Sequence, residues 1–168
     1  MRTFIGLLAA TILTAMPAGA ADELSWDDLI PSGYEEPITP GEPLHDPNSL
    51  GNAVDESGVP AAQLEPMAPV VSELDGREVR LPGYIVPLDI SDGRVVEFLL
   101  VPYFGACIHV PPPPSNQVVH VRSQQGIELD ALYQPFWITG PMRVETVQSE
   151  LANAGYRISA SQVEPYEY

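Results

Sequence analysis

The sequence predicts a mainly β fold made of short antiparallel strands. From residue 70 onward, short runs rich in Val, Ile, Leu and aromatic residues recur along the chain, and Asp75-Gly76 and Asp92-Gly93 separate some of them. Such pairs are typical of tight turns between strands. Five or six strands with one late helix indicate a small, partly closed barrel of the oligonucleotide/oligosaccharide-binding (OB) type. A β-roll or sandwich is the alternative.

The first strands of this barrel are expected between residues 79 and 101. Residues 79–88 are largely apolar and predict a long strand, in which Pro82-Gly83 marks a bulge or a bend. Asp92-Gly93 then predicts a hairpin turn into a second strand at residues 95–101. These two strands would form one wall of the barrel.

Three further strands are expected in the second half of the chain. They are residues 116–122, 136–144 and 156–160. Gln125-Gly126 predicts a turn, residues 127–132 fit a short strand or a helical turn, and Pro141 marks an irregularity in its strand.

One late helix is expected before the last strand. Val147, Leu151 and Ala154 recur at helical spacing. Thr146 fits the N-cap of this helix, and Gly155 fits the position just past its end.

The chain divides into a signal sequence, an arm and one domain. Residues 1–20 combine an early arginine, an apolar run and Ala18-Gly19-Ala20, which predicts a secretory signal peptide that is cleaved after Ala20. No other apolar run approaches the length that spans a membrane, so no membrane span is expected. Residues 70–168 are expected to form the β domain.

Residues 21–69 predict an extended, acidic, proline-rich arm. The segment has eleven carboxylates, eight prolines and no lysine or arginine, and such a composition buries little apolar surface. Within it, Ser25 fits the cap of a turn that presents Trp26, Leu29 and Ile30. Trp26 is then either a docking residue for a partner or a residue that packs on its own domain.

The charge of the chain restricts its partners. The formal net charge is −16 and the sequence contains no lysine. A chain with so few basic groups cannot neutralise phosphates, so nucleic acid is not an expected partner. Metal ions and basic protein surfaces are compatible with this charge.

The most distinctive stretch is the loop that begins at Cys107. His109 follows two residues later, and the four prolines 111–114 hold an extended path. In an extended segment Cys107 and His109 project to the same side, and both are good ligands for zinc or copper. With His120 as a third ligand they predict a metal site. The alternative is a buried thiol and a histidine that bonds a loop carbonyl.

Two polar residues after the prolines have alternative roles. Asn116 and Gln117 fit a partner-binding loop, or they satisfy loop carbonyls and amides. In a thiol enzyme, Cys107 would be the nucleophile and His109 or His120 the base. No signature of a cysteine hydrolase is present, and Cys107 is the only cysteine, so no internal disulfide can form.

Several segments carry a specific resemblance to a known family. Residues 81–88 and 97–117, including Cys-Ile-His-Val-Pro-Pro-Pro-Pro, are the strongest, and residues 24–31 and 156–166 resemble the family's two ends. On these residues the sequence resembles the bacterial secreted family called domain of unknown function 3299, over nearly all of the chain after the signal sequence.

The resemblance implies a periplasmic protein without an established activity. It also implies a link to metal traffic, because members often lie in zinc-responsive gene clusters with an ABC transporter and a histidine-rich periplasmic protein. Some relatives look like lipoproteins, whereas this chain has no cysteine near the predicted cleavage site.

Taken together, these observations predict a non-enzymatic periplasmic accessory protein of zinc homeostasis. It would bind zinc or copper, or a transporter component, through the loop of Cys107, His109 and the prolines. The expected partner is the periplasmic face of an ABC transporter or a metal-binding periplasmic protein. One alternative is an interaction module without metal, in which the loop is a structural staple. The other is a thiol-dependent enzyme.

Overall fold

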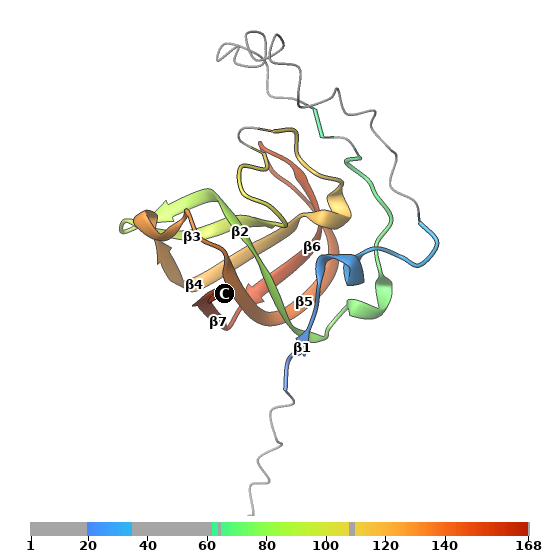
Figure 1. Cartoon of the computed structure of the whole chain (residues 1–168), viewed down its shortest axis with the longest axis horizontal. Helices are drawn as coiled ribbons and strands as arrows, with labels where there is room; N and C mark the ends of the chain where they lie inside the picture. Colours follow the sequence, from blue (N-terminus) through green and yellow to red (C-terminus); the bar gives the residue numbers. More distant parts are fainter. Residues whose placement is uncertain (1–19, 35–61, 64, 108–109, 168) are drawn as a thin grey trace, which may run out of the picture.

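Seven strands and four 3-10 turns form the described part of the chain (Figure 1). The computed structural model describes residues 20–34, 62–63, 65–107 and 110–167. The predicted signal sequence except Ala20, and residues 35–61 and 64 of the predicted arm, lie outside the described residues. In chain order the elements are β1 (Asp22–Glu23), η1 (Trp26–Leu29), η2 (Ser72–Leu74), β2 (Glu78–Ser91), β3 (Arg94–Val101), η3 (Ser115–Gln117), β4 (Val119–Glu128), η4 (Leu129–Ala131), β5 (Phe136–Gln148), β6 (Asn153–Ala160) and β7 (Gln162–Pro165).

Five of these strands close into a barrel. The strand order is β2-β3-β4-β6-β5, and β5 pairs back onto β2. All neighbours are antiparallel except β4 and β6, which run parallel. This order is that of an OB barrel, so the predicted mainly β, OB-like fold is confirmed. The strands β1 and β7 extend the sheet beside β2 and β5.

The long strand β2 closes the barrel because it changes partners halfway. Its first part, up to Gly83, pairs with β5, and from Tyr84 onward it pairs with β3. A Cβ atom on Gly83 would lie only 2.8 Å from Leu100 Cγ and from the carbonyl oxygen of Val101. Glycine is therefore needed at this switch, where the sequence predicted a bulge or a bend.

The two faces of the barrel wall carry separate apolar clusters. Phe98 and Leu100 of β3 belong to the interior core, which Tyr156 and Leu29 also join. The alternate residues Leu99 and Val101 belong to a second cluster. Because side chains alternate along a strand, this second cluster lies on the outer face of the wall.

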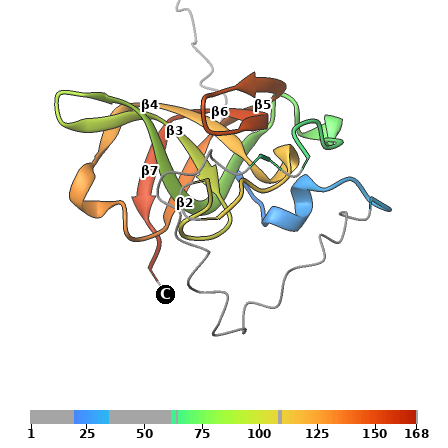
Figure 2. The same ribbon diagram turned by 90° about the horizontal axis from the view of Figure 1, so that it is seen from above.

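The predicted hairpin turn at Asp92-Gly93 is confirmed. Asp92 and Gly93 both have positive φ, as a two-residue hairpin turn requires. The hairpin lies on the opposite side of the barrel from η1 and η2 (Figure 2).

The predicted late helix is wrong. In an OB barrel a helix usually joins the third and fourth strands, and here the short turn η4 takes that place.

The residues expected to form the late helix form a β-hairpin instead. Val147 of β5 and Ala154 of β6 are register partners, so their helical spacing reflects a pairing across a turn. Ser149 closes that turn, because its hydroxyl donates to the carbonyl of Ala152 and accepts from the N–H of Ala152. Gly155 lies within β6 and not at a helix terminus, and a Cβ there would meet Ser115 and Val70.

Two smaller predictions also need correction. Gln125-Gly126 is not a turn between strands, because β4 continues through it to Glu128. Gly126 has a φ of 64°, and Arg94 donates to the carbonyls of Gln125 and Gly126 at this irregularity. The strand expected from residue 116 begins only at Val119, since Asn116 and Gln117 belong to η3.

The described parts of the arm pack on the barrel. Asp22 and Glu23 pair with β2 as β1, and Leu29 is fully buried in the core. The Tyr156 hydroxyl donates to the carbonyl of Leu29 at 2.7 Å and accepts from the N–H of Val71 at 2.7 Å. No helix among the described residues has the length and apolar character that crossing a membrane requires.

The Tyr156 hydroxyl is expected to be a major contributor to stability. A Tyr156→Phe substitution leaves two backbone groups without their partner, and each buried unpaired group costs about 1–3 kcal/mol. We expect the free energy of unfolding, measured by urea denaturation, to fall by at least the cost of one such group, about 1–3 kcal/mol. Tyr133→Phe is the control, because Tyr133 is 74% exposed. An equal effect of both substitutions would contradict the prediction.

Candidate functional site

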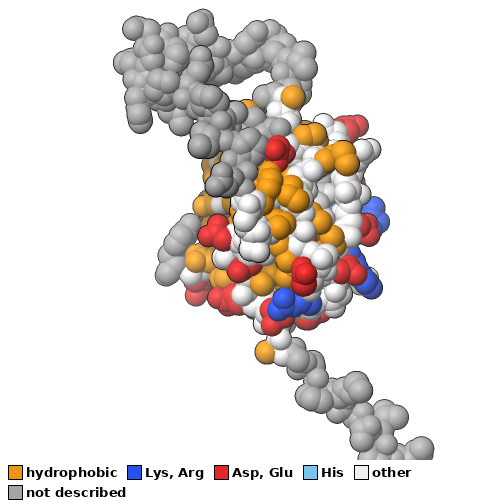
Figure 3. Space-filling model, turned by 90° about the vertical axis from the view of Figure 1, so that its right-hand side faces the viewer, with side chains coloured by type: hydrophobic (Ala, Val, Ile, Leu, Met, Phe, Trp, Pro, Cys, Tyr) orange, Lys and Arg blue, Asp and Glu red, His pale blue; other side chains and the backbone are white. Residues whose placement is uncertain are grey.

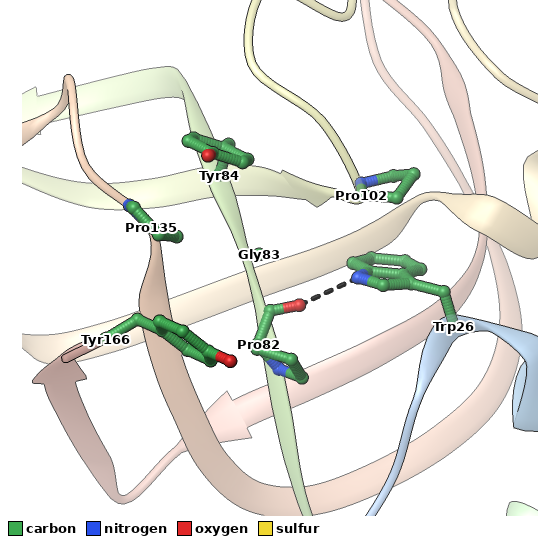
Figure 4. A pocket seen from close by; sticks show the side chains of 7 residues that line it. All are labelled: Trp26, Pro82, Gly83, Tyr84, Pro102, Pro135 and Tyr166. Atoms are coloured by element: carbon green, nitrogen blue, oxygen red, sulfur yellow. Dashed lines mark hydrogen bonds between the residues drawn. The ribbon is translucent and has the colours of Figure 1, made fainter. Parts of the chain in front are cut away.

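A shallow groove lies where β2 changes partners. It has a volume of about 190 Å³ and is lined by aromatic, proline and glycine residues, namely Trp26, Pro82, Gly83, Tyr84, Pro102, Pro135 and Tyr166. Figure 4 shows the rings of Trp26, Tyr84 and Tyr166 on three sides of Gly83. The lining comes from η1, from β2 and from the segments that follow β3, precede β5 and follow β7. The barrel thus gathers residues from the whole chain at one point.

The Trp26 wall of the groove is fixed from three directions. The carboxylate of Asp28 accepts hydrogen bonds from the hydroxyl and the N–H of Ser25, which close the turn η1 and hold the pKa of Asp28 below its usual range. The indole N–H of Trp26 donates to the carbonyl of Pro82 at 2.8 Å. The side-chain amide of Gln117 donates to the carbonyl of Trp26 at 2.9 Å. Trp26 therefore packs on its own domain and still lines the groove.

The Tyr166 wall is held by stacking. Tyr166 stacks on Trp137 with ring centroids 5.1 Å apart, and the guanidinium of Arg80 lies 4.1 Å above the Trp137 ring. The N–H of Tyr166 donates to the carbonyl of Pro135 at 3.0 Å. Trp137 thus contacts both an arginine and the tyrosine that lines the groove.

Further aromatic side chains flank the groove. Phe104 packs edge-on against Tyr84, with ring centroids 5.8 Å apart, and is itself 62% exposed. Tyr103, which follows the lining residue Pro102 in the chain, is also exposed. Exposed aromatic side chains gathered around a groove are typical of a binding surface.

The polar residues after the proline run hold the arm to the barrel. Ser115, Asn116 and Gln117 are all buried. The hydroxyl of Ser115 accepts from the N–H of Ala68, and the amide of Asn116 donates to the carbonyl of Pro69. Among the residues predicted to bind a partner, Gln117 and Trp26 contact each other. The side-chain amides of Asn116 and Gln117 both donate hydrogen bonds to backbone carbonyls of the chain itself.

The loop that contains Cys107 is pinned at both ends. Ala106 and Val110 form a β-bridge, and Cys107 has a φ of 64°. The thiol packs against the outer apolar cluster, and burial raises its pKa to about 11. Gln63 fixes the proline run by donating to the carbonyl of Pro113. The predicted ligand His109 lies outside the described residues.

His120 is buried on the outer side of β4 beside an acidic partner. Its Nε2 lies 2.7 Å from a carboxylate oxygen of Glu97, which also pairs with Arg122. Burial raises the pKa of Glu97, but the bonds to His120 and Arg122 outweigh this effect and leave it below its usual value. The described residues contain no group of three or more potential metal ligands. Among the described residues His120 therefore has a carboxylate partner, and the predicted metal site with Cys107 and His109 stays a prediction, because His109 lies outside them.

Negative charge exceeds positive charge on the described surface. All six described arginines pair with carboxylates, so each is at least partly neutralised. On the face in Figure 3, the blue arginine atoms lie beside red carboxylates, while other red groups stand apart from any blue ones. The charge that this surface presents to a partner is therefore negative.

The sequence did not single out Tyr84, Tyr166, Pro102 and Pro135 as site residues. They are far apart in the chain, and only the closure of the barrel brings them together. The one local signal was their chemistry, because aromatic residues stand beside prolines in Pro82-Gly83-Tyr84, Pro102-Tyr103-Phe104, Pro135-Phe136 and Pro165-Tyr166.

Comparisons with known proteins agree with this architecture. A family model described as "Protein of unknown function (DUF3299)" matches residues 26–165. The chain is similar to a crystal structure, at 2.45 Å resolution, of a DUF3299 family protein from Pseudomonas aeruginosa PAO1. The two share 58% sequence identity and superpose with a TM-score of 0.75, over 89% of this chain and 99% of that chain. No curated protein matches the chain.

The thiol of Cys107 is expected to be unreactive at neutral pH. Only the thiolate is alkylated, and a pKa of about 11 reduces its population at pH 7. Relative to an unperturbed thiol, the population is about 100-fold lower. We expect iodoacetamide to label the folded protein slowly, with a rate that rises with pH up to that pKa. The urea-unfolded protein is the control and should react at the ordinary rate. Rapid labelling of the folded protein at pH 6 would instead indicate an activated nucleophile.

Proposed function

The chain belongs to the DUF3299 family of proteins of unknown function, and we propose that it is a periplasmic accessory protein that binds an extended, basic segment of a partner protein. The groove of Trp26, Tyr84 and Tyr166 is the proposed binding site. The single observation that carries the proposal is this aromatic and proline-lined groove with exposed aromatic residues around it.

The chemistry of the groove favours a protein segment as its occupant. Grooves lined by aromatic residues and prolines bind extended peptides, because flat rings pack against proline and aliphatic side chains. The groove volume of about 190 Å³ is small for a whole small-molecule ligand. A segment that lies across the groove and inserts single side chains fits these dimensions better.

Charge favours a basic partner. The described arginines are paired with carboxylates other than Asp27 and Glu167, which are the chain neighbours of Trp26 and Tyr166. Complementary charge raises the association rate and excludes acidic partners. The predicted signal sequence and the resemblance to secreted proteins support a periplasmic location, where the face of an ABC transporter or a metal-binding protein would be the partner.

A second candidate function is transition-metal binding through Cys107 and His109. It is favoured by the bridge between Ala106 and Val110, which holds the ends of the loop together. A loop whose ends are already fixed loses less conformational freedom when it binds a ligand. Residues 107 and 109 would supply a thiolate and an imidazole to zinc or copper. The burial that raises the thiol pKa opposes this function, because the thiol must lose its proton to bind a metal.

The proposed groove can be tested by peptide selection. A phage-displayed library of random dodecapeptides is selected against the wild-type protein, and the enriched peptides are synthesised. We expect them to bind with micromolar affinity and to bind Tyr166→Ala at least tenfold more weakly. Tyr133→Ala is the matched control, because Tyr133 is an exposed tyrosine that does not line the groove.

Two results of that selection would contradict the proposal. One is that no peptide is enriched over an unrelated acidic protein of similar charge. The other is that the enriched peptides bind Tyr166→Ala and the wild-type protein equally well, which would place the binding surface elsewhere.

The metal candidate is tested by calorimetric titration with zinc and with copper. If the loop binds metal, one ion per chain is expected at neutral pH, and the affinity should rise with pH as the thiol deprotonates. Cys107→Ser and His109→Ala should each remove most of the affinity, while His45→Ala should leave it unchanged. Stoichiometric binding that survives loss of both Cys107 and His109 would place the metal elsewhere.

A further inference from the structure

The groove presents aromatic faces and contains no charged side chain of its own. Its lining consists of two tyrosines, one tryptophan, three prolines and a glycine. The face of an aromatic ring is electron-rich and attracts a cation that lies within about 6 Å of its centre. The indole N–H of Trp26 already donates to Pro82, so this tryptophan offers its ring rather than its hydrogen bond to a ligand.

Carboxylates stand next to the groove residues in the chain. Asp27 follows Trp26, and Glu164 and Glu167 lie on either side of Tyr166, all of them exposed. The nearby Arg80 does not supply free positive charge, because it pairs with Glu23 and Glu164. A positively charged group that enters the groove therefore meets aromatic rings, and exposed carboxylates are adjacent in the chain to Trp26 and Tyr166.

The chain itself shows which cation suits these rings. Arg80 lies 4.1 Å above Trp137, which stacks in turn on Tyr166. Tyr166 is shared, since it belongs both to this stack and to the groove lining. A guanidinium is planar and weakly hydrated, so it stacks on aromatic rings better than the compact, strongly hydrated ammonium of lysine.

We infer that the groove is an arginine-binding site, in which an arginine side chain of the partner segment packs between Trp26, Tyr84 and Tyr166. This inference rests on the proposed function and names the chemistry of its partner. The guanidinium continues the stack of Arg80, Trp137 and Tyr166 on the groove side of Tyr166. Asp27 and Glu167 attract it electrostatically, and the prolines contact its aliphatic stem.

The inference is tested with small probes that separate charge from shape. N-acetyl-arginine N-methylamide is titrated into the isotopically labelled wild-type protein, and the indole N–H signals of Trp26 and Trp137 are followed by NMR. The corresponding derivative of citrulline is the neutral probe of similar shape. We expect millimolar binding of the arginine derivative, at least fivefold tighter than that of the citrulline and lysine derivatives, and weaker at 500 mM than at 50 mM salt.

Variants place the probe in the groove. Tyr166→Ala should weaken arginine binding at least tenfold, while Tyr166→Phe, which keeps the ring, should stay within threefold of the wild type. Glu167→Gln should weaken binding about twofold through the lost charge. Tyr133→Ala is the control on an exposed ring outside the groove and should bind like the wild type.

The outcomes separate this inference from the proposed function. Equal binding of the arginine and citrulline derivatives, or tighter binding of tetramethylammonium than of the arginine derivative, would overturn the arginine site. Selected peptides that occupy the groove but tolerate replacement of every arginine would also overturn it and would leave the proposed function standing. Arginine binding together with failure of the peptide selection would overturn the proposed function instead.

Discussion

The buried amide of Gln117 is the contact on which the rest of the site depends. It donates to the carbonyl of Trp26 and so ties the start of the described chain to the turn that follows the proline run. Asn116 and Ser115 do the same for Pro69 and Ala68. Buried polar groups that lose their partners are costly, so these bonds fix one arrangement of arm and barrel. The position of the Trp26 ring, and with it the groove, follows from that arrangement.

The proline run supports this contact because it fixes the path of the chain that leads into η3. Prolines 111–114 lead directly into η3, and each fixes its own φ and gives no N–H to a ladder. Gln63 donates to the carbonyl of Pro113 and also bonds Asn153 of β6. Gly155 then permits the close approach of Ser115 to β6, since any Cβ there would lie 3.0 Å from its carbonyl oxygen. The loop that looks most like a ligand-binding motif in the sequence thus also serves as a brace.

Much of the barrel was predictable because its signals are local. The bend at Pro82-Gly83, the turn at Asp92-Gly93 and the strand at residues 95–101 each depend on a few neighbouring residues. The late helix was wrong because Val147 and Ala154 satisfy a helical spacing and a hairpin register equally well. The hairpin is selected by the pairing of β5 with β6 and by the hydrogen bonds of Ser149 to Ala152 in the turn, and the pairing is not a local signal. The groove was not predictable, since barrel closure rather than sequence spacing brings Tyr84 and Tyr166 together.

The groove joins the two ends of the described chain. Trp26 lies in its first turn and Tyr166 follows its last strand, and both line the same hollow over β2. No fragment that lacks either end can assemble the complete lining. A ligand that binds there binds only the finished fold, so its binding energy adds to the stability of the whole barrel rather than to one loop. Occupancy of the groove would therefore report that both ends of the described chain are in place on the barrel.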